Sequence, residues 1–387
     1  MMIPPSYSFR NIVSHKVTSA LTILGIGLVV FVFTGSMMLT EGLKTTMVAT
    51  GHDENVIAIR KASQTEVQSI VYYSQANILR TLPEIAVADN GSPLITNELY
   101  VLIGVKNRRS SDEAHVVVRG ITDKSMVLRP NVKMIEGRMW QDAGSEIIAG
   151  KGASQRFVGC GLGETVRFGS RDWTVVGIFD AEGTAFDSEL WGEYEQVSDA
   201  FNRPMYSSLT FRMNDTAQFA AMVKKIETDP RLPLDVKREK DYYESQSRTF
   251  STFIGITGTV ISIVFSLGAI IGAMITMYAA VANRITEIGT LRSLGFSRFS
   301  ILTAFLFESL LIAFFGGAIG IVAALFLKSF QISTTNWDTF SEVAFNFDIS
   351  WNIVITAIVF ALIMGTMGGF LPAVRAARLK IVDSLRA

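Results

Sequence analysis

Residues 17–40, VTSALTILGIGLVVFVFTGSMMLT, lie between Lys16 and Glu41 and contain no charged side chain. A helix needs about 20 apolar residues to cross the roughly 30 Å hydrocarbon layer of a membrane, and this stretch has 24. The apolar region of a cleaved signal peptide is shorter, about 7–15 residues, and is followed by a small-residue cleavage motif. The stretch therefore favours a membrane-spanning helix over residues 17–41, with a cleaved signal peptide as the alternative.

A second uncharged stretch lies between Arg248 and Arg284 and is 35 residues long. As a helix it would measure about 50 Å, which exceeds the apolar thickness of a membrane even with tilt. We therefore expect a stalk outside the membrane that continues into the second span, together residues 248–282.

Two more spans are expected nearer the C-terminus. The third covers residues 299–327 and contains one charged residue, Glu308. The fourth covers residues 351–371 and begins with Trp351, a residue type that is common at membrane interfaces. Because proline lacks a backbone N–H and interrupts helices, Pro372 is expected to limit this last helix.

The distribution of basic residues predicts the orientation in the membrane. Arginine and lysine outnumber acids in residues 1–16, in the loop 283–298 and in the tail 372–387, whereas the loop 328–350 has one lysine and three acids. Basic segments remain in the cytoplasm. We therefore expect a multi-pass protein of the bacterial inner (plasma) membrane with both termini cytoplasmic and with residues 42–247 outside.

The composition excludes several other classes of protein. Hydrophobic residues make up 49% of the 387 and charged residues 18%, which indicates both membrane-embedded and soluble parts. The formal net charge is zero, so nothing points to nucleic acid. Cys160 is the only cysteine, which excludes internal disulfides and thiolate metal clusters. The absence of a recognisable Ser-His-Asp constellation or His-x-x-x-His spacing argues against an enzyme.

Residues 42–247 have the composition of a soluble domain. Between residues 99 and 180, runs such as LYVLIGV, HVVVRG and WTVVGIF alternate with glycines, which predicts mostly β structure. Further strands are expected at residues 55–60 and 85–88, and helices at 74–82 and 216–228. The predicted fold class is a membrane protein with four transmembrane α-helices plus an α+β extracytoplasmic domain with a β-rich insert at about residues 90–195.

The loop 283–298, which reads NRITEIGTLRSLGFS from Asn283 to Ser297, predicts a short rigid helix. Arg284 and Glu287 stand three residues apart, a spacing that permits an ion pair on a helix. Gly295 is typical of a helix end, and Ser297 of the N-cap of the next helix. The residues expected on one apolar face are Ile288, Leu291 and Leu294. The alternative is a basic loop that only sets the orientation.

This order of elements resembles the MacB-like and FtsX-like permeases of ABC transporters (type VII ABC superfamily), in the form without a fused ATPase domain. The family signature R-x-x-E-I-G-x-x-R-x-L-G-x-S is matched at Arg284, Glu287, Ile288, Gly289, Arg292, Leu294, Gly295 and Ser297. Similar stretches are SFRNIVSHKVTSALTILGIGLVV, FESLLIAFFGGAIG, LPAVRAARLKIVDSLR and the region from GRMW to WTVVGIF.

The resemblance implies a non-catalytic permease subunit that couples ATP hydrolysis by a separate ABC ATPase to movements of its outer domain. Residues 283–298, including Leu291, would be the coupling helix that contacts the ATPase. The implied partners are a second permease copy or paralogue, a periplasmic adaptor and membrane lipids, with ATP and Mg bound by the ATPase and no cofactor bound directly. Export or extraction of a hydrophobic or amphipathic substrate is expected; the alternative is an FtsX-like regulator of a cell-wall hydrolase.

Three other features are candidates for a role. Glu308 is costly if ionised against lipid, which indicates either proton coupling or structural pairing with a polar partner. Small-xxx-small spacing, which permits close helix contact within a chain or between copies, occurs at Gly268, Gly272, Gly316 and Gly320. The run GTAFDSELW carries aromatic residues that look exposed, so its candidate contacts with a periplasmic partner are Phe186, Asp187 and Trp191, against an ordinary β-connection.

Both ends of the chain are expected to form amphipathic segments on the cytoplasmic side, with lipid or the ATPase as alternative contacts for the tail. The apolar residues of the first segment are Phe9, Ile12 and Val13, and those of the tail are Val374, Ala377, Ile381 and Leu385.

Overall fold

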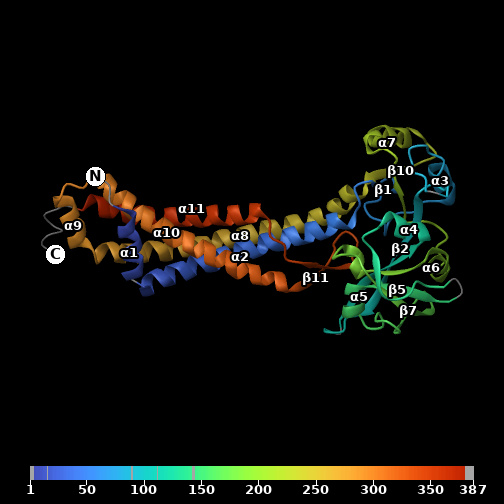
Figure 1. Ribbon diagram of the computed structural model, residues 1–387, viewed down its shortest axis with the longest axis horizontal. Helices are drawn as coiled ribbons and strands as arrows, with labels where there is room; N and C mark the ends of the chain where they lie inside the picture. Colours follow the sequence, from blue (N-terminus) through green and yellow to red (C-terminus); the bar gives the residue numbers. More distant parts are fainter. Residues whose placement is uncertain (1–3, 15, 89, 111, 142–143, 380–387) are drawn as a thin grey trace. The chain divides into compact units, whose positions relative to one another are not determined.

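The computed structural model describes residues 4–14, 16–88, 90–110, 112–141 and 144–379 (Figure 1). The chain forms two compact units. The helical unit comprises Met1–Gly42, Thr252–Phe330 and Phe347–Ala387, and the sheet unit comprises Leu43–Ser251 and Gln331–Asn346.

Long helices make up the helical unit, and two of them continue into the sheet unit. Their bounds are α1 Pro5–Ser14, α2 Lys16–Thr50, α8 Glu239–Ala282, α9 Ile285–Ser293, α10 Arg298–Leu325 with the 3-10 turn η3 Phe326–Ser329, and α11 Trp351–Arg378. Among the described residues, α2, α8, α10 and α11 are long and apolar enough to cross a membrane. The predicted four transmembrane helices are therefore confirmed.

The helices that join the two units are longer than their membrane spans. Helix α2 has 35 residues and ends at Thr50, beyond the expected end of the first span at residue 41. Helix α8 has 44 residues and begins at Glu239, so the stalk starts before residue 248, where the uncharged stretch begins. The first turns of α8 carry charged residues, so the helix begins well before the uncharged stretch does.

Helix α11 does not end at Pro372, and the expected limit there is wrong. The helix continues to Arg378 with Pro372 inside it. A proline normally clashes with the carbonyl four residues earlier, but that residue is Gly368, which is followed by Gly369. Both glycines are closely packed, since a Cβ atom on Gly368 would lie 2.9 Å from the Cβ of Ala273 and one on Gly369 would overlap the Ser309 hydroxyl. Neighbouring helices of this kind support prolines in membrane helices.

Glycines set the spacing between α2 and α10. A Cβ atom on Gly320 would lie 2.5 Å from the carbonyl oxygen of Gly27, and one on Gly316 would lie 2.9 Å from that of Ile23. Gly316 and Gly320 therefore serve helix packing within the chain. Gly268 and Gly272 on α8 differ, because a Cβ atom there would meet nothing within 4 Å.

The sheet unit is built on one mixed sheet of ten strands. Its path is β10-β1-β9-β2-β3-β8-β5-β7-β4, with β6 paired to β7. The strand bounds are β1 Asn55–Arg60, β2 Ile95–Lys106, β3 Glu113–Ile121, β4 Lys133–Gly137, β5 Glu146–Gly150, β6 Thr165–Phe168, β7 Arg171–Asp180, β8 Leu190–Glu193, β9 Ser208–Arg212 and β10 Leu234–Arg238. The other elements are α3 Tyr73–Leu79, α4 Asp123–Leu128, α5 Lys151–Arg156, η1 Ala185–Ser188, α6 Tyr194–Ala200, η2 Thr216–Gln218 and α7 Phe219–Thr228.

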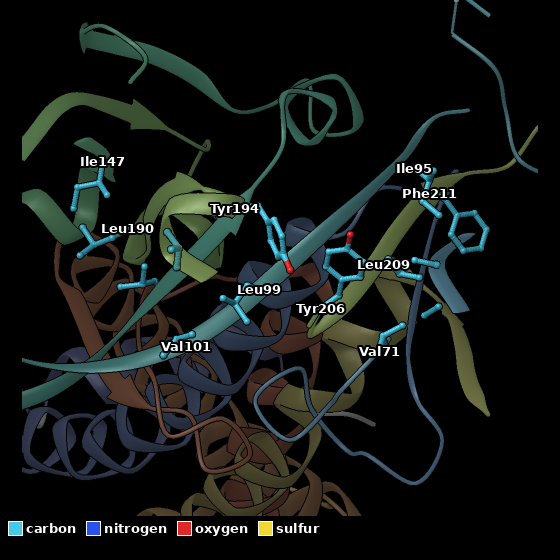
Figure 2. Packing of buried hydrophobic residues seen from close by; sticks show 14 of the residues in the cluster. Val71, Ile95, Leu99, Val101, Ile147, Leu190, Tyr194, Tyr206, Leu209 and Phe211 are labelled. Atoms are coloured by element: carbon cyan, nitrogen blue, oxygen red, sulfur yellow. The ribbon is translucent and has the colours of Figure 1, made fainter. Parts of the chain in front are cut away.

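Strand β2 joins the expected α+β part to the expected β-rich insert. Its first residues, from Ile95, pair with β9, and its later residues, from Leu99, pair with β3. Figure 2 shows the buried side chains of both parts along this strand, in one continuous core. The region from 90 to 195 is therefore rich in β structure, as expected, but it shares its sheet and core with the rest of the unit.

Two smaller expectations differ from the structure. Residues 85–88 form isolated bridges, Ile85 with Met213 and Val87 with Pro93, rather than a strand. Residues within the loop 328–350 form a hairpin of β11 Gln331–Thr335 and β12 Glu342–Asn346, which belongs to the sheet unit.

We expect Gly320→Ala to destabilise the helical unit, whereas Gly268→Ala should not. The first methyl group would overlap the backbone of α2, and overpacking of this kind costs about 1–3 kcal/mol. The second enters open space and adds helix propensity. Thermal unfolding of the detergent-solubilised variants measures the difference, and equal midpoints would contradict this packing.

Candidate functional site

Helix α9 follows α8 after a break at Asn283 and Arg284. Its end and the start of α10 have the features that the sequence predicts. Gly295 has a φ of +93°, a left-handed conformation that glycine adopts without strain. The Ser297 side chain accepts a hydrogen bond of 3.1 Å from the backbone N–H of Ser300 and so caps α10.

The inner face of α9 packs against three other helices. Ile288 is 1% exposed and belongs to a core with Met277 of α8, Phe305 of α10 and Ala376 of α11. The neighbouring Gly289 is also buried. Movement of α9 would therefore disturb α8, α10 and α11 together.

The apolar face of α9 is shorter than expected. Leu291 and Arg292 are half-buried, but Leu294 is 70% exposed, so the expected face that includes it is wrong. Leu294 lies six residues after Ile288, about 240° around a helix, and it forms the C-cap. The exposed Leu294 is available to a partner on this side.

A buried polar cluster fixes the start of α9. The Arg284 side chain is 5% exposed; its Nε donates to Glu287 at 3.0 Å and its Nη1 to Glu308 at 3.1 Å. Its guanidinium also lies over the rings of Tyr7 and Phe305, at 5.1 and 5.0 Å from their centroids. Burial lowers the pKa of Arg284, but the carboxylate of Glu308 and the other partners raise it by more. Arg284 therefore stays charged.

Helix α1 contributes two residues to this cluster. The Tyr7 hydroxyl donates to Glu287, and the Asn11 amide donates to Glu308. Burial, together with the bond to Glu287, raises the pKa of Tyr7 to about 12, so the hydroxyl remains a donor at neutral pH. Sequence analysis missed both residues, although their spacing of four places them on one side of a helix.

The two ends of the chain fit the amphipathic expectation only in part. Ile12 packs against the helical core, whereas Phe9 is 53% exposed. The side chain of Val13 lies outside the described residues. In the tail Val374 is half-buried and Ala377 is buried, while Ile381 and Leu385 lie outside the described residues.

Glu308 has polar partners inside the bundle. Besides Arg284 and Asn11, it lines a small cavity of mixed character, whose polar residues include Thr18, Ser19 and Asn283. A carboxylate with a charged partner and an amide donor fits the structural-pairing interpretation better than proton coupling.

At the other end of α2 and α8, both helices are attached to the sheet unit. The Thr50 hydroxyl accepts a 2.9 Å hydrogen bond from the backbone N–H of Ala185. The Glu239 carboxylate accepts from the backbone N–H of His52 at 3.0 Å and from the Asn55 amide at 2.9 Å. The last residue of α2 and the first residue of α8 are thus held by the same unit.

Glu239 also belongs to a buried ion network. Arg119 donates to Glu66, Glu98 and Glu189 at 2.8–2.9 Å, and Arg129 donates to Glu98 and to Glu239, the latter at 3.4 Å. Every one of these side chains is at most 6% exposed. Burial raises the pKa of Glu98, but the Arg129 and Arg119 guanidinium groups lower it by more. This contribution to stability is present at neutral pH and is lost as the pH falls through the lowered pKa.

The expected partner-binding aromatics lie inside this network. Phe186 and Trp191 are completely buried, so the expectation that they are exposed is wrong. The Phe186 ring lies 4.7 Å from the Arg129 guanidinium, and the Trp191 indole donates to Glu189 at 2.7 Å. Asp187 is half-buried and accepts from the backbone N–H groups of Ala181 and Gly183. Aromatic rings favour positions over a desolvated arginine, and no pattern in the sequence indicates that these arginines are buried.

In the described part of the chain, no group of three or more His, Cys, Asp or Glu residues is arranged to hold a metal ion. The arrangement offers packed helices and buried charge pairs.

Comparison with known proteins identifies both parts of the chain. Residues 19–229 match the MacB-like periplasmic core domain, and residues 259–381 match the FtsX-like permease C-terminal domain. The "Uncharacterized ABC transporter permease YknZ" of Bacillus subtilis is 25% identical, over 98% of this chain and 97% of the relative. The "Macrolide export ATP-binding/permease protein MacB" of Vibrio parahaemolyticus is 25% identical over 96% of this chain, which spans 58% of that relative. The solved extracellular domain of YknZ from Gram-positive bacteria is 14% identical, with a TM-score of 0.34 over 47% of this chain and 99% of that chain.

We expect Glu98→Ala to destabilise the sheet unit strongly, because it leaves Arg129 with Glu239 as its one remaining carboxylate in the network. Removal of one partner of a buried pair costs about 3–5 kcal/mol. Cys160 is buried, and burial raises its pKa to about 12, so its reaction with a thiol dye reports unfolding.

The control is Lys133→Ala, which removes the exposed pair with Glu182 and should change stability by less than about 1 kcal/mol. Faster labelling of Cys160 in Glu98→Ala alone is the expected result. Equal labelling rates in both variants and the wild type would refute the importance of the network.

Proposed function

Because this chain belongs to the MacB-like and FtsX-like family of ABC transporter permeases, we propose that it converts ATP hydrolysis by a partner ATPase into movement of its outer domain. That movement would drive export or extraction of a hydrophobic or amphipathic substrate. The observation that carries the proposal is α8, an unbroken helix of 44 residues between the buried Glu239 and the segment that leads into α9.

The length and the fixed ends of α8 support this proposal. At about 1.5 Å per residue, the helix measures roughly 66 Å, more than twice the apolar thickness of a membrane. One end is held in the ion network of the sheet unit, and the other lies directly before α9. A helix held at both ends transmits displacement with little loss, whereas a flexible linker absorbs it.

Helix α9 is the proposed coupling helix. Its contacts with the partner ATPase would come from the exposed Glu287 and Leu294, with Arg292 and Gly295 beside them. The buried Arg284, Ile288 and Gly289 would carry the displacement to the spans. The half-buried Leu291 and Ser297, the N-cap of α10, would hold the second half of the segment in place.

The wider assembly is proposed from the family. Relatives combine this permease with an ATPase, so ATP and Mg would be bound by that partner. A second permease copy or paralogue, a periplasmic adaptor and membrane lipids would complete a complex in the inner membrane, with both chain termini in the cytoplasm. The "Macrolide export" name of the MacB relatives supports export of a hydrophobic substrate.

The cellular test is deletion of this chain together with its partner ATPase. Envelope lipids, lipoproteins and exported compounds are then compared with peptidoglycan hydrolysis. Altered export or lipid composition is expected. An unchanged efflux and lipid profile with impaired hydrolysis would replace export by the FtsX-like regulatory function.

We expect Gly295→Pro to uncouple ATP hydrolysis from movement of the outer domain, whereas Gly295→Asn should not. Proline requires a φ near −65° and lacks the N–H that Gly295 donates to the Arg292 carbonyl. Asparagine tolerates the left-handed conformation. The measurement is the nucleotide-dependent change in trypsin cleavage of the outer domain, with ATPase rate recorded in parallel.

In Gly295→Pro that change should fall at least about tenfold, equivalent to 1.4 kcal/mol. The chain should still insert and bind the ATPase. A full nucleotide-dependent change in Gly295→Pro would refute the assignment of α9.

A further inference from the structure

The hairpin of β11 and β12 connects α10 to α11, yet it forms part of the sheet unit. Its strands pair in antiparallel register from Gln331 with Asn346 to Thr335 with Glu342. The turn between them is ordered, since the Asn336 N–H donates to the Ser341 carbonyl at 2.8 Å. The hairpin is thus a formed element and not a loose loop.

Charged and polar contacts attach the hairpin to the sheet unit. Arg156 Nη1 donates to Glu342 at 3.1 Å, and these side chains are 13% and 11% exposed. Arg156 Nη2 donates to the Ser188 hydroxyl at 2.8 Å, which in turn accepts from the backbone N–H of Ala344 at 3.2 Å. Arg156 and Ser188 therefore hold two adjacent parts of β12.

Apolar burial strengthens the attachment. Val343, Ala344 and Phe345 are consecutive residues of β12, and all three are at most 6% exposed. In the turn, Trp337 packs edge-on against Phe250 of α8, with ring centroids 5.1 Å apart. Detachment would expose these residues to water and separate a largely buried ion pair, and both changes are unfavourable.

The ends of the hairpin are fixed within the helical unit. Lys328 and Asp348 form an ion pair of 3.6 Å across the base, and the backbone N–H of Asp348 donates to the Met38 carbonyl of α2 at 3.2 Å. Phe330 alone separates η3 from β11, and residues 347–350 separate β12 from α11, so both connecting segments are short.

We infer that this hairpin is a second force-transmitting connection, which stays attached to the outer domain throughout the ATPase cycle. One path would run from α9 along α8 to the ion network, and the other from α9 along α10 to β12. The inference rests on the proposed function. It adds that all four spans, and not only the first two, act on the outer domain.

Charge reversal tests the path through Glu342. Glu342→Arg places two cations together and should detach β12. The double variant, Arg156→Glu with Glu342→Arg, restores an ion pair in which the two charges have exchanged places. In complex with the partner ATPase, the single variant should show a nucleotide-dependent change in trypsin cleavage that is about tenfold smaller than that of the wild type. The double variant should recover it, and ATPase rates should remain similar.

A disulfide tests permanent attachment. Ser188→Cys with Ala344→Cys joins positions whose side chain and backbone already make contact, and the buried Cys160 does not compete. The oxidised variant should keep its nucleotide-dependent change. Loss of that change on oxidation, with recovery on reduction, would show that the hairpin must detach and would overturn the inference.

Failure of the hairpin connection and failure of the coupling through α9 would give different results. If Glu342→Arg prevents formation of the 188–344 disulfide but keeps the full nucleotide-dependent change, and Gly295→Pro loses it, the hairpin does not carry force while α9 does. If Gly295→Pro also keeps the full change, the proposed coupling itself is wrong.

Discussion

The buried carboxylate of Glu239 imposes the constraint on which the rest of the structure depends. A buried ion costs several kcal/mol unless its lone pairs find donors, and Glu239 obtains them from Asn55, His52 and Arg129. Arg129 in turn shares Glu98 with Arg119. The first residue of α8 therefore cannot leave the sheet unit without exposing unpaired charges, and the first turn of α8 is fixed to the sheet.

A similar arrangement operates at the inner end on a smaller scale. Arg284 is buried between Glu287 of α9 and Glu308 of α10, and α1 supplies Tyr7 and Asn11 to the two carboxylates. The cluster around one guanidinium thus joins α9 and α10 to α1, which is distant in sequence. In both places a buried arginine fixes the end of a helix, where apolar packing alone would permit sliding.

The sequence predicts much of this molecule because membranes impose simple rules. Spans follow from apolar length, and α9 follows from its glycine and serine signals. The buried ion network was not predictable, because its members come from distant segments and each looks like an ordinary exposed charge. Phe186 and Trp191 were misplaced for the same reason: their burial depends on arginines that only the fold brings to them. Pro372 does not end the helix as expected, and the close packing of neighbouring helices against this part of α11 is not visible in the sequence.

The central claim is that nucleotide bound by the partner ATPase moves the outer domain. The most direct measurement is the distance between spin labels at Lys225→Cys, an exposed position on α7, in the two permease copies of the proposed complex. Buried Cys160 should remain unlabelled. The distance distribution should shift when ATP and orthovanadate trap the ATPase. An unchanged distribution in a complex that hydrolyses ATP would contradict it.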